Sequence, residues 1–275
     1  MSADNITDRE FNQFQRFIYD AAGIALSPAK KAMVSGRLAK RLQQYRLDSY
    51  ADYFRLLESG DAPSEVQVAV DLLTTNETYF FRESSHFDQL RELTAAVHNG
   101  SRGGTPRTQP FRVWSAASSS GEEAYSIAMV LADCMPDTPW EVFGSDISTR
   151  VLQRARAGHY PIERTTHIPP DYLKRYCLKG IGEQKGTLLI ERTLRQRVQF
   201  AQVNLNAPLP QLGMFDAIFL RNVLIYFNGD TKRQVVGRVL AQLKPGGHFF
   251  IGHSESLHDI TEAVQPLMPS LYRKP

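Results

Sequence analysis

The chain has 275 residues, of which 42% are hydrophobic and 22% are charged, and its formal net charge is +3. This composition is typical of a soluble globular protein, and so small a net charge does not by itself indicate nucleic-acid binding. No apolar run approaches the roughly 18 residues that span a bilayer, and the polar N-terminus is unlike a signal peptide, so we expect a cytoplasmic protein without membrane insertion. Cys134 and Cys177 are isolated thiols, which argues against a disulfide framework or a zinc site.

The first part of the chain has the pattern of a small helical domain, which we place at residues 1–70. Thr7 and Glu10 form the sequence signature of a capping box, and apolar residues follow at helical spacing. Three further helical segments are indicated before residue 74.

The second helix of this domain, residues 28–46, is strongly basic. Before the first acid, Asp48, it contains six cations, which are Lys30, Lys31, Arg37, Lys40, Arg41 and Arg46. A charged stripe is most often a solvated helix face, but six cations without an intervening acid favour an anionic partner. That partner is either an acidic protein or a nucleic acid.

From residue 111 onward, strand and helix patterns alternate. A strand at 111–116 is followed by a tight turn, a helix from 122 and a second strand at 141–146. Strands separated by helices predict a Rossmann-like, doubly wound parallel sheet in a domain of residues 71–275. The further strands expected are 198–201, 215–220 and, after a turn at 244–247, 248–252.

The turn after the first strand suits a cationic nucleoside. It lacks the G-x-G-x-x-G pattern of pyrophosphate-binding turns, and the next helix opens with Glu122 and Glu123, which would repel phosphate. Asp146 ends the second strand, where an acid accepts hydrogen bonds from ribose hydroxyls; its alternative role is an N-cap for the following helix. S-adenosylmethionine is a phosphate-free nucleoside with positive charge, and we expect it as the cofactor.

Polar residues also follow the third and fourth strands. In open parallel sheets, ligands bind at the carboxyl ends of the strands. Such positions are occupied here by Asn204 after the third strand and by Arg221 and Asn222 after the fourth. The alternative for each asparagine is a role in a turn.

A glycine-rich stretch interrupts the alternation. With the apolar run at 187–190 it predicts a small antiparallel β insert, residues 178–195, in which Leu188, Leu189 and Ile190 lie at an exposed edge.

Residues 74–83, between the two domains, are aromatic rather than rich in Pro, Gly or Ser, unlike a flexible linker. The alternative is a packed interdomain helix in which Arg82 pairs with Glu83 or Glu77.

Four motifs together resemble the CheR family of bacterial chemotaxis methyltransferases. They are TTNETYFFRE at 74–83, VWSAASSSGEEAYSIA at 113–128, FDAIFLRNVLIYF at 215–227 and GHSES at 252–256. The likeness extends over essentially the whole chain. It implies an S-adenosylmethionine-dependent protein-glutamate O-methyltransferase, which forms methyl esters on the cytoplasmic helices of chemoreceptors (methyl-accepting chemotaxis proteins) during adaptation.

The resemblance also implies the roles of individual residues. Those that bind the cofactor are Asn76, Thr78 and Arg82 at its methionine end, Glu123 at its ammonium group, Asp146 at the ribose, Asn204 and Leu205 beside the adenine, and Arg221 and Asn222 at the floor. The catalytic pair, which would hold the acceptor carboxylate, is Arg82 and Tyr226.

The partners follow from the same resemblance. Chemoreceptor helices would dock on the basic helix 28–46, and a receptor C-terminal tail would bind the β insert; a hairpin that only shields the rim of the site is the alternative for that insert. We expect a monomer without metal or nucleic acid. A nucleic-acid or small-molecule methyltransferase and a non-catalytic cofactor sensor are the competing classes, and the presence of both Arg82 and Tyr226 argues against the sensor.

Overall fold

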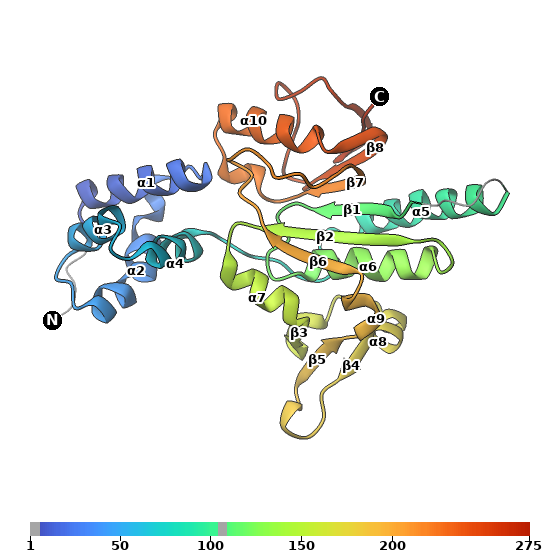
Figure 1. Cartoon of the computed structure of the whole chain (residues 1–275), viewed down its shortest axis with the longest axis horizontal. Helices are drawn as coiled ribbons and strands as arrows, with labels where there is room; N and C mark the ends of the chain where they lie inside the picture. Colours follow the sequence, from blue (N-terminus) through green and yellow to red (C-terminus); the bar gives the residue numbers. More distant parts are fainter. Residues whose placement is uncertain (1–5, 104–108) are drawn as a thin grey trace.

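The computed structural model describes residues 6–103 and 109–275. Figure 1 shows a bundle of helices at the N-terminal end, a central sheet covered by helices and a small sheet that projects from the main body. The predicted fold class, a doubly wound α/β domain with a helical N-terminal domain and a small antiparallel sheet, is confirmed. In the described ranges, no helix is both long and apolar enough to cross a membrane.

The N-terminal bundle begins with the predicted capping box. The Thr7 hydroxyl accepts a hydrogen bond from the Glu10 N–H at 3.2 Å, and the Glu10 carboxylate accepts one from the Thr7 N–H at 2.8 Å. The core of the bundle includes Phe14 and Tyr53, whose ring centroids are 6.1 Å apart. Its elements are α1 (Asp8–Ala22), η1 (Pro28–Lys30), α2 (Lys31–Tyr45), α3 (Tyr50–Ser59) and α4 (Pro63–Leu73).

The basic stretch forms η1 and α2, and part of its charge is used within the bundle. Arg41 makes an ion pair with the buried Glu65 of α4. Arg37 donates hydrogen bonds to the backbone carbonyls of Leu72 and Thr74 at 3.1 and 2.8 Å, so it caps the C-terminal end of α4. The cations of this stretch whose side chains make no hydrogen bond or ion pair within the described ranges are Lys30, Lys40 and Arg46.

The central domain has a seven-stranded sheet. Its elements are α5 (Ser85–Gly103), β1 (Phe111–Ser115), α6 (Glu122–Cys134), β2 (Trp140–Asp146), α7 (Thr149–Ala157), β6 (Val198–Gln202), β7 (Phe215–Leu220), η4 (Leu224–Tyr226), α10 (Gly229–Leu240), β8 (Leu243–Ile251), β9 (Gln265–Met268) and β10 (Leu271–Arg273). The strand order is β6-β2-β1-β7-β8-β10-β9, in which the first five strands are parallel. Helices α5 and α6 pack on one face and α10 on the other (Figure 1).

The strand order reverses between β1 and β7. From β1 the chain moves outward through β2 and β6, and it then returns to place β7 and β8 on the other side. Connections on either side of such a reversal lead to opposite faces of the sheet, so a crevice opens at the carboxyl ends of the strands. The predicted polar residues follow strands at this edge.

The expected turn at 244–247 is wrong, because these residues lie inside β8. The register between β7 and β8 shifts there: Phe215 pairs with Leu243, whereas Ala217 pairs with His248. Proline and glycine within a strand mark such irregularities as well as turns.

The small sheet has the order β3-β5-β4, with β3 at His159–Pro161, β4 at Cys177–Lys179 and β5 at Thr187–Ile190. The expectation that residues 187–190 form an exposed edge is wrong, because β5 is paired on both sides. Its partner β3 precedes the expected insert 178–195. The other elements of this part are η2 (Ile162–Thr165), α8 (Pro170–Tyr176), η3 (Gly182–Gln184) and α9 (Arg192–Arg195).

The chain between α4 and α5 is irregular, so the alternative of a packed interdomain helix is wrong. The helical bundle is instead joined to the sheet domain by polar contacts. Asp71 of α4 accepts hydrogen bonds from the N–H groups of Thr149 and Arg150 at 3.0 and 3.2 Å, and so caps the N-terminus of α7. The Ala25 N–H donates to the Tyr226 carbonyl at 2.8 Å. The bundle therefore lies against the carboxyl edge of the sheet.

Candidate active site

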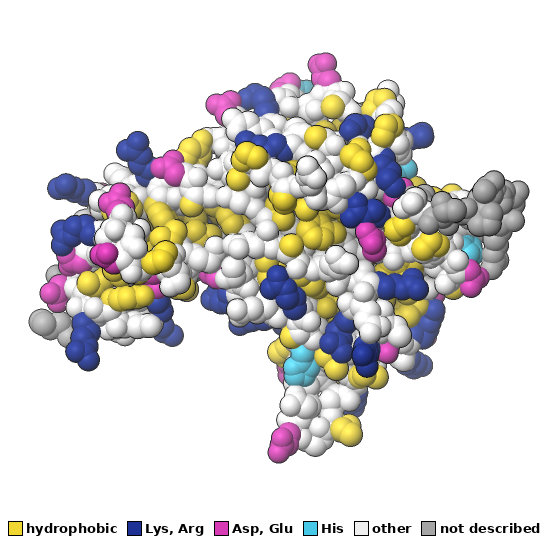
Figure 2. Space-filling view, viewed as in Figure 1, with side chains coloured by type: hydrophobic (Ala, Val, Ile, Leu, Met, Phe, Trp, Pro, Cys, Tyr) yellow, Lys and Arg dark blue, Asp and Glu magenta, His cyan; other side chains and the backbone are white. Residues whose placement is uncertain are grey.

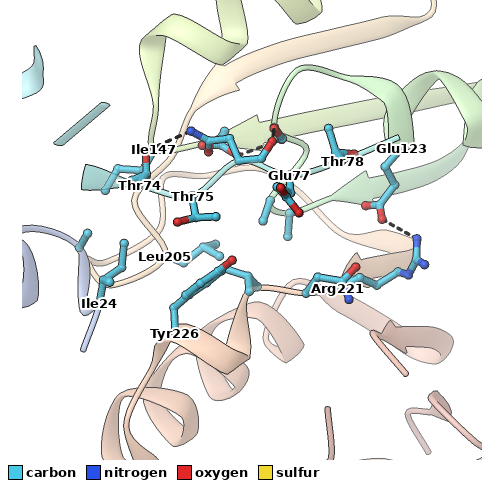
Figure 3. Close-up of a pocket in the computed structure, with 18 of the residues that line it drawn as sticks. Ile24, Thr74, Thr75, Glu77, Thr78, Glu123, Ile147, Leu205, Arg221 and Tyr226 are labelled. Carbon is cyan, nitrogen blue, oxygen red and sulfur yellow. Dashed lines mark hydrogen bonds and ion pairs between the residues drawn. The ribbon is translucent and has the colours of Figure 1, made fainter. Parts of the chain in front are cut away.

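One cavity gathers every cofactor-binding and catalytic residue that the family resemblance implied. It lies at the carboxyl ends of the parallel strands, and the segment 74–82 and the loop after β7 form two of its walls (Figure 3). Its space, counted together with the solvent that reaches into it, is about 950 Å³. The predicted residues that line it are Asn76, Thr78, Arg82, Glu123, Asp146, Asn204, Leu205, Arg221, Asn222 and Tyr226.

Asp146 ends β2 at this cavity. Its Oδ2 accepts a hydrogen bond from the Ser119 N–H at 2.9 Å, and its Oδ1 accepts one from the Ser148 N–H at 2.9 Å. The N-cap of α7 is Ser148 itself, so the N-cap alternative for Asp146 is wrong. The Asp146 carboxylate lines the ligand space. Burial raises its pKa to about 6 despite these two bonds. Each carboxylate oxygen keeps a lone pair that a ligand hydroxyl can use.

Arg221 lies between two carboxylates at another part of the cavity. Its Nη1 donates to Glu123 Oε2 at 2.7 Å, as Figure 3 shows, and its Nη2 donates to Glu83 Oε2 at 2.9 Å. Burial raises the pKa of Glu123, and Arg221 opposes that rise only in part. One guanidinium for two part-buried carboxylates leaves negative charge that a cationic ligand can neutralise.

Arg82 and Tyr226 line the same cavity. Arg82 Nη1 donates to the Glu77 carbonyl at 2.9 Å. Within the described ranges Arg82 has no ion pair with Glu77 or Glu83, contrary to the alternative, so its remaining N–H groups can bind an anion. Burial raises the pKa of Tyr226, although the charge of Arg82 opposes this, so its phenol is a neutral donor at neutral pH.

Asn204 has its side chain engaged by the protein. Its Nδ2 donates to the Ala21 carbonyl at 2.7 Å, and its Oδ1 accepts from the Asn206 N–H at 2.9 Å. It therefore ties the end of α1 to the cavity. The neighbouring wall is apolar and is formed by Leu205 together with two residues that the sequence did not predict, Ala22 and Ile24.

The segment 74–82 is fixed by backbone contacts. The Ser119 hydroxyl donates to the Asn76 carbonyl at 2.9 Å, and Arg164 Nη2 donates to the Thr78 carbonyl at 3.0 Å. The Asn76 amide donates to the Thr74 hydroxyl at 3.1 Å. These contacts hold the polar start of the motif beside the turn that follows β1.

Glu122, the first of the two helix-start glutamates, does not line the cavity. It is buried, with Oε1 2.6 Å from Arg164 Nη2, and its Oε2 accepts from the Ser120 hydroxyl at 2.7 Å. The expectation that carboxylates at this helix start face a cationic ligand therefore applies to Glu123 alone.

Two carboxylates that shape the loop after β7 were missed by the sequence reasoning. Glu255 accepts hydrogen bonds from the N–H groups of Asn222 and Gly252 at 2.8 and 2.6 Å. Glu83 accepts one from the Asn222 amide at 3.0 Å. Glu83 and Asn222 have φ of 58° and 57°, the left-handed region that side chains rarely adopt, so both positions are held by their surroundings. The GHSES motif was the available signal for Glu255.

Glu83, His86 and His253 place their ligand atoms within 4.8 Å of one another. A metal ion does not fit them, because the charged Nη2 of Arg221 already lies 2.9 Å from Glu83 and would repel a dication. Burial lowers the pKa of His86 to about 3, so its ring is neutral, and it packs edge-on against His253 and Phe250. We assign the two histidines a packing role.

A doubly wound sheet with a strand-end carboxylate, a second carboxylate for a cation and no phosphate-binding glycine loop is the arrangement of an S-adenosylmethionine-dependent methyltransferase. Residues 76–271 match the S-adenosylmethionine-binding domain of CheR methyltransferases, and residues 9–74 match their all-alpha domain. The chain belongs to this family, and it is an S-adenosylmethionine-dependent methyltransferase.

Three relatives show how far the similarity extends. The chemotaxis protein methyltransferase of Escherichia coli K12 is 43% identical over 91% of this chain and 85% of its own length. That of Salmonella typhimurium is 41% identical over 93% of this chain and 86% of its own. Chemotaxis protein methyltransferase 2 of Pseudomonas aeruginosa is 41% identical over 97% of this chain and 93% of its own.

Proposed function

We propose that this enzyme methylates glutamate side chains on the cytoplasmic helices of chemoreceptors and produces glutamate methyl esters. The observation that supports this most is the presence of Arg82 and Tyr226, an anion-binding and a neutral hydrogen-bonding side chain, in the same cavity as the part-buried carboxylate Glu123. The names of the relatives place them in chemotaxis, where receptors are the expected substrates.

The chemistry requires positioning rather than proton transfer. A free glutamate has a pKa of about 4.3, so the acceptor is already an anionic nucleophile at neutral pH and needs no general base. The cofactor supplies a methyl group activated by the charge of its sulfonium. Arg82 offers its planar guanidinium to one carboxylate oxygen, and Tyr226 donates its hydroxyl. Both orient the acceptor oxygen toward the methyl group.

Incubation with S-adenosylmethionine tritiated at the methyl group and with receptor-containing membranes tests this function. Label on the receptor band that alkali releases as methanol identifies a methyl ester. Label that survives alkali, or label on nucleic acid in a parallel reaction, would assign the enzyme to another acceptor class.

The affinity for S-adenosylmethionine should depend on pH through Asp146. Its pKa is about 6 in the free enzyme, and ribose hydroxyls that donate to the carboxylate favour its ionised form, so affinity should rise as the pH rises through 6. Calorimetry should show about tenfold tighter binding at pH 7 than at pH 5.

The Asp146→Asn variant is the control for this pH effect. Burial also raises the pKa of Glu123, which adds a change of the same sign, so the decisive comparison is between the two proteins. The variant should bind more weakly at pH 7 and show a flatter profile. Parallel profiles for the two proteins would remove Asp146 from the ribose site.

The free cations of the basic stretch are the proposed docking contacts for acidic receptor helices. Figure 2 shows Lys and Arg side chains along the outer edge of the helical bundle. Arg37 and Arg41 are unsuitable for testing this, because they cap α4 and pair with the buried Glu65. Lys40→Glu with Arg46→Glu should raise the KM for receptor about tenfold at low salt and leave cofactor affinity unchanged.

The matched control reverses two exposed or half-exposed cations outside the bundle, Arg192 on α9 and Lys232 on α10. Added salt should weaken the wild type and this control more than the Lys40/Arg46 variant, since screening acts on exposed charges. An equal KM for all three proteins would place the docking face elsewhere.

A receptor tail, the second proposed contact, would have to pair with an edge of the small sheet. Because β5 is central, the edges are β3 and β4. On β4, Leu178 is 52% exposed, and Ile181 just beyond it is 83% exposed, so this edge offers apolar surface to an extended peptide.

A further inference from the structure

Glu83 connects three segments that are distant in the sequence. Its Oε2 accepts hydrogen bonds from Arg221 Nη2 at 2.9 Å and from the His253 N–H at 3.1 Å, and its Oε1 accepts one from the Asn222 amide at 3.0 Å. The side chain is largely shielded from solvent. Burial raises the pKa of Glu83, but the bond from Asn222 and the charge of Arg221 outweigh it, and the pKa falls to about 2. Glu83 is therefore a fixed anion beside the cavity.

Arg221 is shared between Glu83 and Glu123. Each of its two terminal nitrogens serves one carboxylate, and Nη2 also donates to the Arg82 carbonyl at 2.5 Å. Its side chain is 1% exposed, so its charge is satisfied by these protein groups rather than by bulk water. The pKa values of the two acids shift in opposite directions: that of Glu83 is lowered and that of Glu123 is raised. Arg221 therefore divides one positive charge between two carboxylates, and Glu83 has the additional bonds from Asn222 and His253.

The neighbouring histidine does not alter this balance. The Nδ1 of His86 lies 3.5 Å from Glu83 Oε2, but burial and the charge of Arg221 keep its ring neutral at physiological pH. Among the described residues, Arg221 is thus the permanent cation in contact with both acids.

We propose that Glu83 is a positioning residue, which holds Arg221 so that Glu123 keeps enough uncompensated charge to bind the ammonium group of the cofactor. The inference rests on the cofactor orientation in which Glu123 faces that ammonium. Without the charge of Glu83, Arg221 would pair with Glu123 alone, and Glu123 would attract a ligand cation less strongly.

The test uses two ligands that differ by one group. They are S-adenosylhomocysteine and its deaminated analogue, which keeps the adenosine, the thioether and the carboxylate. In Glu83→Gln the side-chain oxygen can still accept from Arg221, and rotation of the Asn222 amide restores the remaining bond. Calorimetry should show that the preference for the amino-containing ligand falls about tenfold, while binding of the deaminated analogue changes less than about twofold.

Glu255→Gln is the matched control. Glu255 anchors the same loop through backbone N–H groups and has no contact with Arg221 among the described residues. If Glu255→Gln only disturbs the loop, the enzyme should bind both ligands more weakly, and by the same factor. An equal loss of affinity for both ligands in Glu83→Gln would overturn the proposal, and Glu83 would then have only a structural role in the loop. Thermal unfolding of each variant checks that it is folded.

A separate outcome tests the underlying orientation. If the wild type does not prefer S-adenosylhomocysteine to the deaminated analogue, Glu123 does not hold the ammonium group and the cofactor lies in another direction. If the wild type shows the preference and Glu123→Gln removes it, the orientation stands, and the result for Glu83→Gln decides the inference alone.

Discussion

Arg82→Ala should lower kcat for receptor methylation about 100-fold while S-adenosylmethionine affinity changes less than about twofold. Among the described residues, the Arg82 side chain donates a hydrogen bond to the Glu77 carbonyl and lies over the Tyr79 ring, so its removal leaves the wall of the cavity intact. What is lost is the group that fixes the acceptor oxygen. Arg82→Lys should be intermediate, because it keeps the charge but not the planar fork. Single-turnover methylation with saturating cofactor, together with calorimetry, separates the two quantities.

Tyr226→Phe is the companion variant, since it removes the hydroxyl and keeps the ring beside the bundle. A loss of turnover without a loss of cofactor affinity is again expected. Equal losses of kcat and cofactor affinity in Arg82→Ala would make Arg82 a cofactor residue instead. Wild-type turnover in Tyr226→Phe would show that its hydroxyl does not orient the acceptor.

Arg221→Ala should be the most damaging change to stability. It leaves Glu83 and Glu123 as two part-buried carboxylates without the buried Arg221, and removing one partner of a buried ion pair costs about 3–5 kcal/mol of unfolding free energy. Urea unfolding monitored by circular dichroism measures the loss. Arg82→Ala, whose guanidinium has no ion pair within the described residues, is the control and should unfold near the wild-type midpoint.

The loss of unfolding free energy in Arg221→Ala should depend on pH. The pKa of Glu83 is depressed to about 2 in the folded protein, so its contribution to stability is present above its unfolded pKa of about 4.3 and disappears as the pH falls toward 2. The difference between wild type and variant should therefore shrink below about pH 4. A difference that stays constant from pH 7 to pH 3 would mean that the cost comes from lost packing and not from unpaired charge.

Local sequence was sufficient for the residues at strand ends. Asp146 ends one buried strand and Asn222 follows another, and the topology of a doubly wound sheet alone brings such positions to one edge. The helix-start position of Glu123 already indicated a cationic ligand. The resemblance added Arg82 and Tyr226, whose roles no periodicity could assign.

The residues that were missed depend on contacts between distant segments. Glu83 lies in a left-handed turn of an irregular segment, and its partners Arg221 and Asn222 are about 140 residues further along the chain. The basic stretch was affected in the same way. Arg41 and Arg37 look free in the sequence because Glu65 and the end of α4, which engage them, come 24 or more residues later. A local pattern reports charge, and only the tertiary fold shows which charge is neutralised.

The apolar wall that Ala22 and Ile24 contribute has a consequence for the modularity of the protein. The helical bundle is an integral part of the nucleoside cavity, and Asp71 and Ala25 fasten it to α7 and to the Tyr226 segment. A gene fusion or exchange that replaced the bundle with another receptor-binding module would have to reproduce those contacts as well as the new specificity. Inheritance of the two parts as one unit is therefore favoured by the geometry of the cavity itself, and new partners are more easily acquired at the small sheet, which lines none of it.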